Sequence, residues 1–134
     1  MNKFTYAASL LLALGLLLSP TAWAAHQPDL NHGKELYEEC SGCHGLKENL
    51  LGPKHCGVVG RKAGTISDFT YSDVMKQSGI VWDDKHLDAF LTSPLSYLPG
   101  TNMGYAGIFD APARADLIAF LKKVSADPQS CSEG

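Results

Sequence analysis

Cys40-Ser41-Gly42-Cys43-His44 is the stretch that decides how this chain folds. Two thiols and an adjacent imidazole at this spacing match the attachment site of a c-type haem. Cys40 and Cys43 can form thioether links to the vinyl groups of one porphyrin, and His44 can then ligate the iron from one side. Ser41 and Gly42 are small enough to let the chain pass under the ring. The motif therefore predicts a domain built around a covalently held cofactor.

Two other kinds of site share part of this motif. A Cys-x-x-Cys pair can be a redox disulfide or half of a zinc site. A thioredoxin-like site follows a strand, and a zinc ribbon needs a second pair of cysteines, whereas Cys56 and Cys131 stand alone. The adjoining His44 favours haem attachment over both alternatives.

The N-terminal segment is organised like an export signal. Lys3 gives a basic start, an apolar run extends from Ala7 to Leu18, and Ala22-Trp23-Ala24 has the small-x-small pattern of a cleavage site. We expect residues 1–24 to be a secretory signal peptide and residues 25–134 to form the mature domain. The alternative is an uncleaved membrane anchor, but the run is shorter than the roughly 20 residues that span a bilayer. Export suits c-type haem, which is attached outside the cytoplasm.

Length and charge limit what the mature chain can be. About 110 residues suffice for one small domain, and no repeat or low-complexity tract divides them. Eleven basic and fourteen acidic side chains give the whole chain a formal charge of −3, and loss of Lys3 lowers it to about −4. This balance does not favour nucleic acid or an anionic membrane surface as a partner. We expect a monomer in the periplasm.

Helical signals alternate with long loops, and no segment shows the alternation of a half-buried strand. A first helix is predicted from Asn31 or His32 into Cys40, a short one over residues 72–77, and another from Asp83-Asp84 to a stop at Pro94. The last helix starts at Pro112 or Ala113 and carries a clear apolar stripe of Leu117, Phe120, Leu121 and Val124. Residues 45–64, with five glycines and a proline, read as loop around the cofactor, and a polar tail follows from Ser125.

A second axial ligand, or a vacant position, separates an electron carrier from a haem enzyme or a gas sensor. The candidates are Met75, Met103, His55, His86, His26 and His32. Methionine more often fills a core than binds a metal. Met103 is nevertheless favoured, because residues 99–104 are rich in glycine and proline and a loop would present its sulfur.

From Gly33 to Lys122 the chain resembles a class I cytochrome c of the bacterial type related to the mitochondrial protein. Besides the Cys40–His44 motif, several segments match in the family's order. They are Gly52-Pro53, 57–64 (GVVGRKAG), 69–72 (FTYS), 79–82 (GIVW), 97–103 (YLPGTNM) and 114–122 (RADLIAFLK). The resemblance implies an all-α class I cytochrome c fold, with helices and long loops around one covalent haem c.

The resemblance also implies the site residues. His44 and Met103 are the expected axial ligands, and the Pro53 carbonyl is expected to accept a hydrogen bond from the His44 ring. The residues expected around the buried haem propionate are Arg61, Tyr71 and Trp82. A buried carboxylate needs such positive partners and hydrogen-bond donors. Gly33 and Tyr37 are expected to meet Leu117 and Phe120 where the first and last helices cross.

The implied function is one-electron transfer rather than enzymatic catalysis. The expected partners are redox proteins, with a dehydrogenase or reductase as donor, an oxidase or another cytochrome as acceptor, and no small-molecule substrate. One alternative is a haem enzyme or sensor in which Met103 is absent from the iron or easily displaced, although no distal acid-base pair is recognisable. Another is a subunit of a membrane complex, tethered by an uncleaved first segment.

Three departures from the family change the expected chemistry. Phe90 replaces a tyrosine that often bonds the methionine sulfur, which predicts a somewhat lower potential. The family's leucine-histidine pair before the loop glycine appears as His55-Cys56, so a polar ring occupies a place that usually packs against the haem. The lysines around the haem edge are replaced by Glu39, Leu95, Ser96 and Asn102. A weakly charged docking surface with modest salt dependence is expected.

Two cysteines remain beyond the haem motif. An exported chain rarely keeps two free thiols, so we expect a disulfide between Cys56 and Cys131. The alternatives are two separate thiols, or a cysteine that pairs with another molecule.

Overall fold

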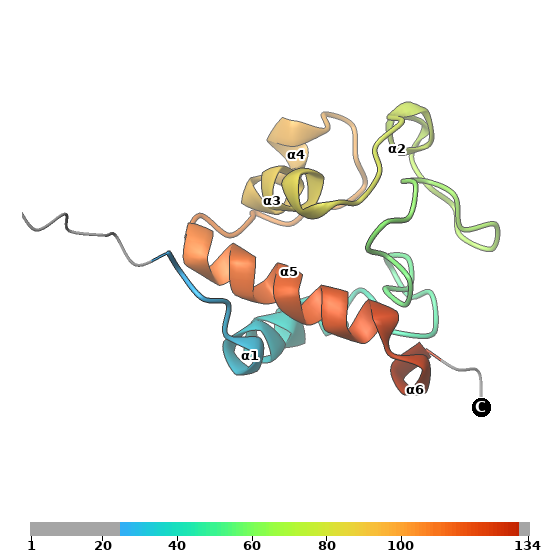
Figure 1. Cartoon of the computed structure of the whole chain (residues 1–134). Helices are drawn as coiled ribbons and strands as arrows, with labels where there is room; N and C mark the ends of the chain where they lie inside the picture. The colour runs from blue at the N-terminus through green and yellow to red at the C-terminus, as the bar shows by residue number, and fades with distance from the viewer. Residues whose placement is uncertain (1–24, 132–134) are drawn as a thin grey trace, which may run out of the picture.

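The computed structural model describes residues 25–131, so the predicted signal peptide lies outside the described residues. Six helices fall in that range: α1 (Leu30–Ser41), α2 (Asp73–Gln77), α3 (Asp84–Thr92), α4 (Pro94–Tyr97), α5 (Ala111–Ala126) and α6 (Pro128–Cys131). Figure 1 shows α5 in the middle, with α1 on one side and α3 and α4 on the other. The described residues contain one isolated bridge, Lys62 with Val81, and no named strand. The all-α prediction is confirmed.

Short polar side chains cap the starts of α1, α2, α3 and α5. The Asp29 carboxylate accepts hydrogen bonds from the backbone N–H groups of Asn31 and His32, so α1 begins slightly earlier than expected. The remaining caps at the start of α2, α3 and α5 are Ser72, Asp83 and Asp110. Each satisfies backbone donors that have no partner inside the helix.

The crossing of α1 and α5 is the centre of the fold. A Cβ atom at Gly33 would overlap the backbone carbonyl of Asp116, so only glycine permits this approach. One turn further, the Tyr37 ring packs on Phe120 with centroids 5.3 Å apart. Leu117 is fully buried beneath the crossing. The predicted meeting of the first and last helices is confirmed, and it fixes where the end of α1 lies.

The long loop between α1 and α2 contributes to the same core. Val58 and Ala63 are buried in it with residues of every helix from α1 to α3 and of α5. The loop is tied to the chain before α3, because Gly60 N–H donates to the Trp82 carbonyl and Ala63 N–H to the Ile80 carbonyl. Backbone groups of an irregular segment are thereby satisfied without a sheet.

Two segments differ from the sequence expectations. Pro94 does end α3, but it also begins α4, because the first turn of a helix needs no N–H from its proline. Ser125 lies inside α5, and the expected polar tail forms α6, whose start is held by Asp127. Within residues 25–131, no helix is long and apolar enough to cross a membrane.

Candidate cofactor-attachment site

The end of α1 brings both thiols and the imidazole into one turn. The backbone N–H groups of Cys43 and His44 donate to the Cys40 carbonyl at 3.0 and 2.9 Å. Neither cysteine is part of a disulfide; Cys40 is partly buried and Cys43 is exposed. Burial raises the pKa of Cys40 to about 11, which is opposite to the lowered pKa of a redox-active Cys-x-x-Cys. Among the described residues no three His, Cys, Asp or Glu side chains lie close enough together to hold a metal ion.

The His44 ring is held in one tautomer. Its Nδ1 lies 2.7 Å from the Pro53 carbonyl oxygen, which can only accept, so Nδ1–H is the donor and Nε2 keeps its lone pair. Burial lowers the pKa of His44, against the opposing effect of this hydrogen bond. A Cβ atom at Gly52 would overlap the ring, so glycine lets the loop close directly against it. The result is a neutral imidazole with a free nitrogen, which suits a metal ligand.

His55 lies against His44, a contact that the sequence did not reveal. The two rings are stacked, with centroids 4.2 Å apart and an angle of 18° between their planes. His55 Nδ1 is also 3.2 Å from the Tyr37 hydroxyl oxygen. Burial, followed by the neighbouring His44 and Arg61 side chains, lowers the pKa of His55 to about 3, so its ring is neutral. This residue packs on the first candidate ligand rather than offering a second one.

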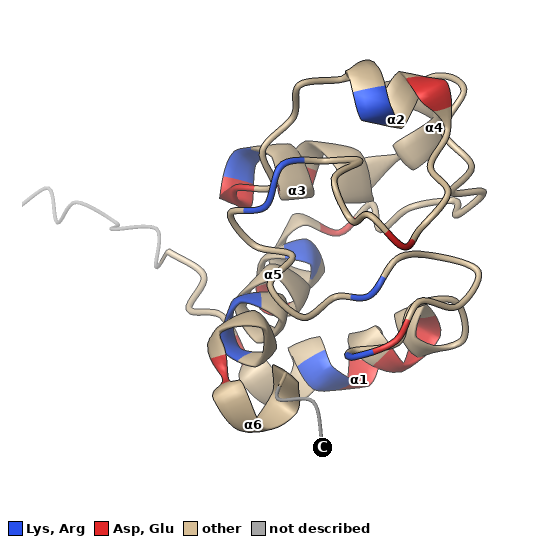
Figure 2. Ribbon diagram, turned by 90° about the vertical axis from the view of Figure 1, so that its right-hand side faces the viewer, with Lys and Arg blue, Asp and Glu red and all other residues tan. Residues whose placement is uncertain are grey.

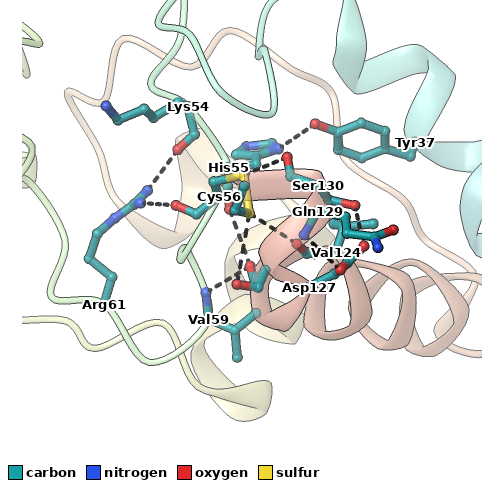
Figure 3. The surroundings of a disulfide bond; sticks show 12 residues. Tyr37, Lys54, His55, Cys56, Val59, Arg61, Val124, Asp127, Gln129 and Ser130 are labelled. Atoms are coloured by element: carbon teal, nitrogen blue, oxygen red, sulfur yellow. Dashed lines mark hydrogen bonds between the residues drawn. A yellow bond between two sulfur atoms is a disulfide. The ribbon is translucent and has the colours of Figure 1, made fainter. Parts of the chain in front are cut away.

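Arg61, Tyr71 and Trp82 come together around the long loop. The Arg61 guanidinium donates to the carbonyls of Cys56 and Lys54, both at 2.9 Å (Figure 3). Trp82 is buried, and its backbone N–H donates to the Arg61 carbonyl at 3.0 Å. Burial raises the pKa of Tyr71, and the charge of Arg61 opposes that rise. Arginine has five N–H donors, so the two carbonyl bonds leave others for a further acceptor.

Met103 stays the favoured candidate for the second ligand. It is partly buried, it lies in the loop after α4, and it packs against the core. The side chains of the other candidates make contacts elsewhere. Met75 is buried in α2, His86 is hydrogen-bonded to Asp83, His26 and His32 are hydrogen-bonded to Asp116, and His55 stacks on His44. The donor set of two thiols, one neutral imidazole and one loop thioether fits a covalent haem c.

Cys56 and Cys131 are joined by a disulfide in the structure, with Cα atoms 5.3 Å apart. Figure 3 shows that this bridge attaches α6 to the long loop beside His55. The Ser125 hydroxyl of α5 also donates to the His55 carbonyl at 3.2 Å. Helix α6 is thus anchored next to the residue that contacts His44.

Comparison with known proteins gives consistent matches. The family model described as Cytochrome c matches residues 30–125, from the start of α1 to the last turn of α5. Cytochrome c of Theileria parva is 46% identical over 101 residues, covering 72% of this chain and 87% of that protein. Cytochrome c2 of Rhodomicrobium vannielii is 39% identical over 114 residues, covering 83% and 90%. The solved structure of cytochrome cH from Methylobacterium extorquens has a TM-score of 0.69 at 38% identity, covering 71% of this chain and 98% of that one.

Proposed function

Because the chain belongs to the cytochrome c family, we propose that it is an exported carrier of single electrons whose haem iron is ligated by His44 and Met103. Family membership establishes the broader statement: the protein has the class I cytochrome c fold, carries covalently attached haem c, and transfers electrons rather than acting as an enzyme. The bound haem supplies a couple between ferric and ferrous iron. Our proposal adds three points to that broader statement: the two ligands of the haem iron, export from the cytoplasm, and the kinds of redox partner.

The main support for this proposal is the hydrogen bond that His44 Nδ1–H donates to the Pro53 carbonyl. It fixes the tautomer in which Nε2 is a lone-pair donor, and it increases the donor strength of the ring. Cys40 and Cys43 lie within the same turn, so thioether links would hold the cofactor against this nitrogen. The free nitrogen and the two thiols therefore form one attachment site.

Met103 is proposed as the second ligand because its thioether comes from a loop that packs on the core. A thioether ligand favours the reduced state, which raises the reduction potential relative to two nitrogen ligands. Arg61, Tyr71 and Trp82 are proposed to surround a haem propionate. Their charge and donors would stabilise a carboxylate that is shielded from water.

Export to the periplasm is supported by the predicted signal peptide, residues 1–24, and by the four cysteines. Two of them are proposed to attach the haem, and the pairing of Cys56 with Cys131 is proposed to persist in an oxidising compartment. In that case the mature chain starts at Ala25. Peptide mass spectrometry without reduction would detect this N-terminus and the bridged peptides, whereas alkylated Cys56 and Cys131 would contradict the disulfide.

Docking to redox partners is proposed to use a surface of low charge. At the positions where mitochondrial-type relatives carry lysines, Leu95 is 52% exposed and Glu39 accepts a hydrogen bond from the Tyr105 hydroxyl at 3.1 Å. Figure 2 shows acidic as well as basic positions along α1. Such a surface provides little long-range steering toward acidic partners. The proposed donor is a dehydrogenase or reductase, and the proposed acceptor is an oxidase or another cytochrome.

A reversible redox titration of the purified native protein, followed optically, tests this function. A carrier is expected to fit a single one-electron transition and to bind no carbon monoxide in its reduced form. Binding of carbon monoxide without a change of pH or denaturant would instead indicate an accessible iron, as in a haem sensor or enzyme.

A further inference from the structure

The His44 imidazole is held on several sides, and these contacts have different effects. The Pro53 carbonyl fixes the position of Nδ1, and Gly52 closes against the ring. A single hydrogen bond still allows the plane of a ring to tilt around the line of that bond. The stacked His55 ring, with 18° between the planes, covers a face of the imidazole and opposes such tilting.

His55 is well placed for this role because it is itself fixed. Its side chain reaches the Tyr37 hydroxyl of α1 at 3.2 Å. Its backbone N–H donates to the Gly45 carbonyl, and its carbonyl accepts from the Ser125 hydroxyl of α5. The next residue, Cys56, is bonded to Cys131 of α6 (Figure 3). His55 is therefore held to α1 through its ring, to α5 through its carbonyl, and to α6 through the neighbouring Cys56.

We propose that His55 is a positioning residue that sets the plane of the His44 imidazole and thereby tunes the electronic state of the iron that His44 binds. This inference rests on the proposed role of His44 as an axial ligand. The orientation of a ligand plane determines which iron d orbital carries the unpaired electron in ferric low-spin haem. It therefore changes the magnetic properties of the iron even where the ligands stay the same.

The test uses two variants of the holoprotein. H55L removes the aromatic ring and keeps an apolar side chain, and H55F keeps a ring that can stack on His44 but loses the nitrogen near Tyr37. Proton NMR of the ferric protein resolves the haem methyl resonances, whose order and spread report the orientation of the axial imidazole. We expect H55L to change the order or spread of these resonances and H55F to retain the wild-type pattern. The free energy of unfolding, measured alongside, separates loss of stability from loss of orientation.

The outcomes distinguish this inference from the proposed function. If H55L is folded and keeps the wild-type methyl pattern, His55 does not set the ligand plane. If H55F loses the pattern as H55L does, stacking is not the cause, and the inference is overturned as well. If H55L does not fold, H55Q, which also lacks an aromatic ring, takes its place in the same comparison with the same two outcomes. A wild-type protein without low-spin haem would instead refute the proposed ligation, independently of His55.

Discussion

Asp116→Asn is expected to destabilise the protein by about 1–2 kcal/mol near pH 5, and by much less in acid. The Asp116 side chain lies in α5 and is only 4% exposed. Its Oδ1 accepts from His26 Nε2 at 2.6 Å and from the Asp29 backbone N–H at 2.8 Å, and its Oδ2 accepts from His32 Nδ1 at 2.7 Å. One buried carboxylate thus ties the segment before α1, and its first turn, to α5.

The magnitude follows from the change in pKa. Burial by itself would raise the pKa of Asp116, but the bonds from His32, Asp29 and His26 outweigh it and lower the pKa from 3.8 to about 2. By linkage, such a lowering corresponds to roughly 2 kcal/mol of stability. The side chains of His26 and His32 are 38% and 46% exposed, so solvent screening reduces the expected loss to about 1–2 kcal/mol.

The sign depends on which group titrates. The pKa of Asp116 is lowered in the folded state, so its contribution is present above about pH 4 and disappears as pH falls toward 2. The pKa of His32 is raised, chiefly by its bond to Asp116, so its contribution is full below 6.5 and is lost as pH rises through the folded value. The difference between wild type and D116N should therefore be largest between about pH 4 and about pH 6.5.

Guanidinium unfolding of the ferric holoproteins, followed by far-UV circular dichroism at about pH 5 and about pH 2.5, measures this difference. D84N is the matched control: Asp84 also pairs with α5, through Lys122 at 2.8 Å, but the two side chains are 63% and 50% exposed. An exposed pair of this kind is worth about 0–1 kcal/mol. Equal losses in D116N and D84N, or a loss in D116N that does not shrink in acid, would refute the reasoning.

Three further predictions address the site and its surface. Phe90→Tyr is expected to raise the midpoint potential by roughly 40 mV, because one hydrogen bond to the Met103 sulfur contributes about 1 kcal/mol in favour of the reduced state. An unchanged potential in a redox titration would contradict this prediction. Replacing Cys56 and Cys131 together by serine opens a loop of 75 residues and should lower the free energy of unfolding by up to about 4 kcal/mol. The loss is smaller where the haem already restrains the chain. Denaturant midpoints equal to those of the wild type would contradict the disulfide. Electron-transfer rates measured by stopped flow should fall only modestly with added salt, and a steep decline would exclude a weakly charged docking surface.

Local sequence patterns predicted most of the helical fold. The apolar stripe of α5 and the Asp83 cap of α3 are short-range signals. The caps Asp29 and Asp110 were not predicted, and α1 and α5 begin one or two residues earlier than expected. The Cys40–His44 turn is equally local, because all of its members lie within five residues. Pro94 is expected to stop α3, and in the structure it also starts α4, since proline suits both positions.

Contacts between distant polar residues could not be predicted in this way. His26 and His32 lie about ninety and eighty-four residues from Asp116, and nothing periodic connects them. The stacking of His55 on His44 depends on how an irregular loop folds back, which glycine and proline content does not specify. The sequence does mark His55 as unusual, because it stands where the family usually has a leucine that packs against the haem. This departure was the one indication in the sequence of the proposed positioning role.

We propose that Met103 and His44 together ligate the haem iron. The most direct test is the oxidised near-infrared spectrum of the native protein beside that of M103A, because methionine sulfur bound to ferric haem gives a weak charge-transfer band there. We expect the band in wild type, together with sharp bands in the reduced visible spectrum, and its loss in M103A with covalent haem retained. A wild-type spectrum without the band, or a band that survives in M103A, would contradict the proposed ligation.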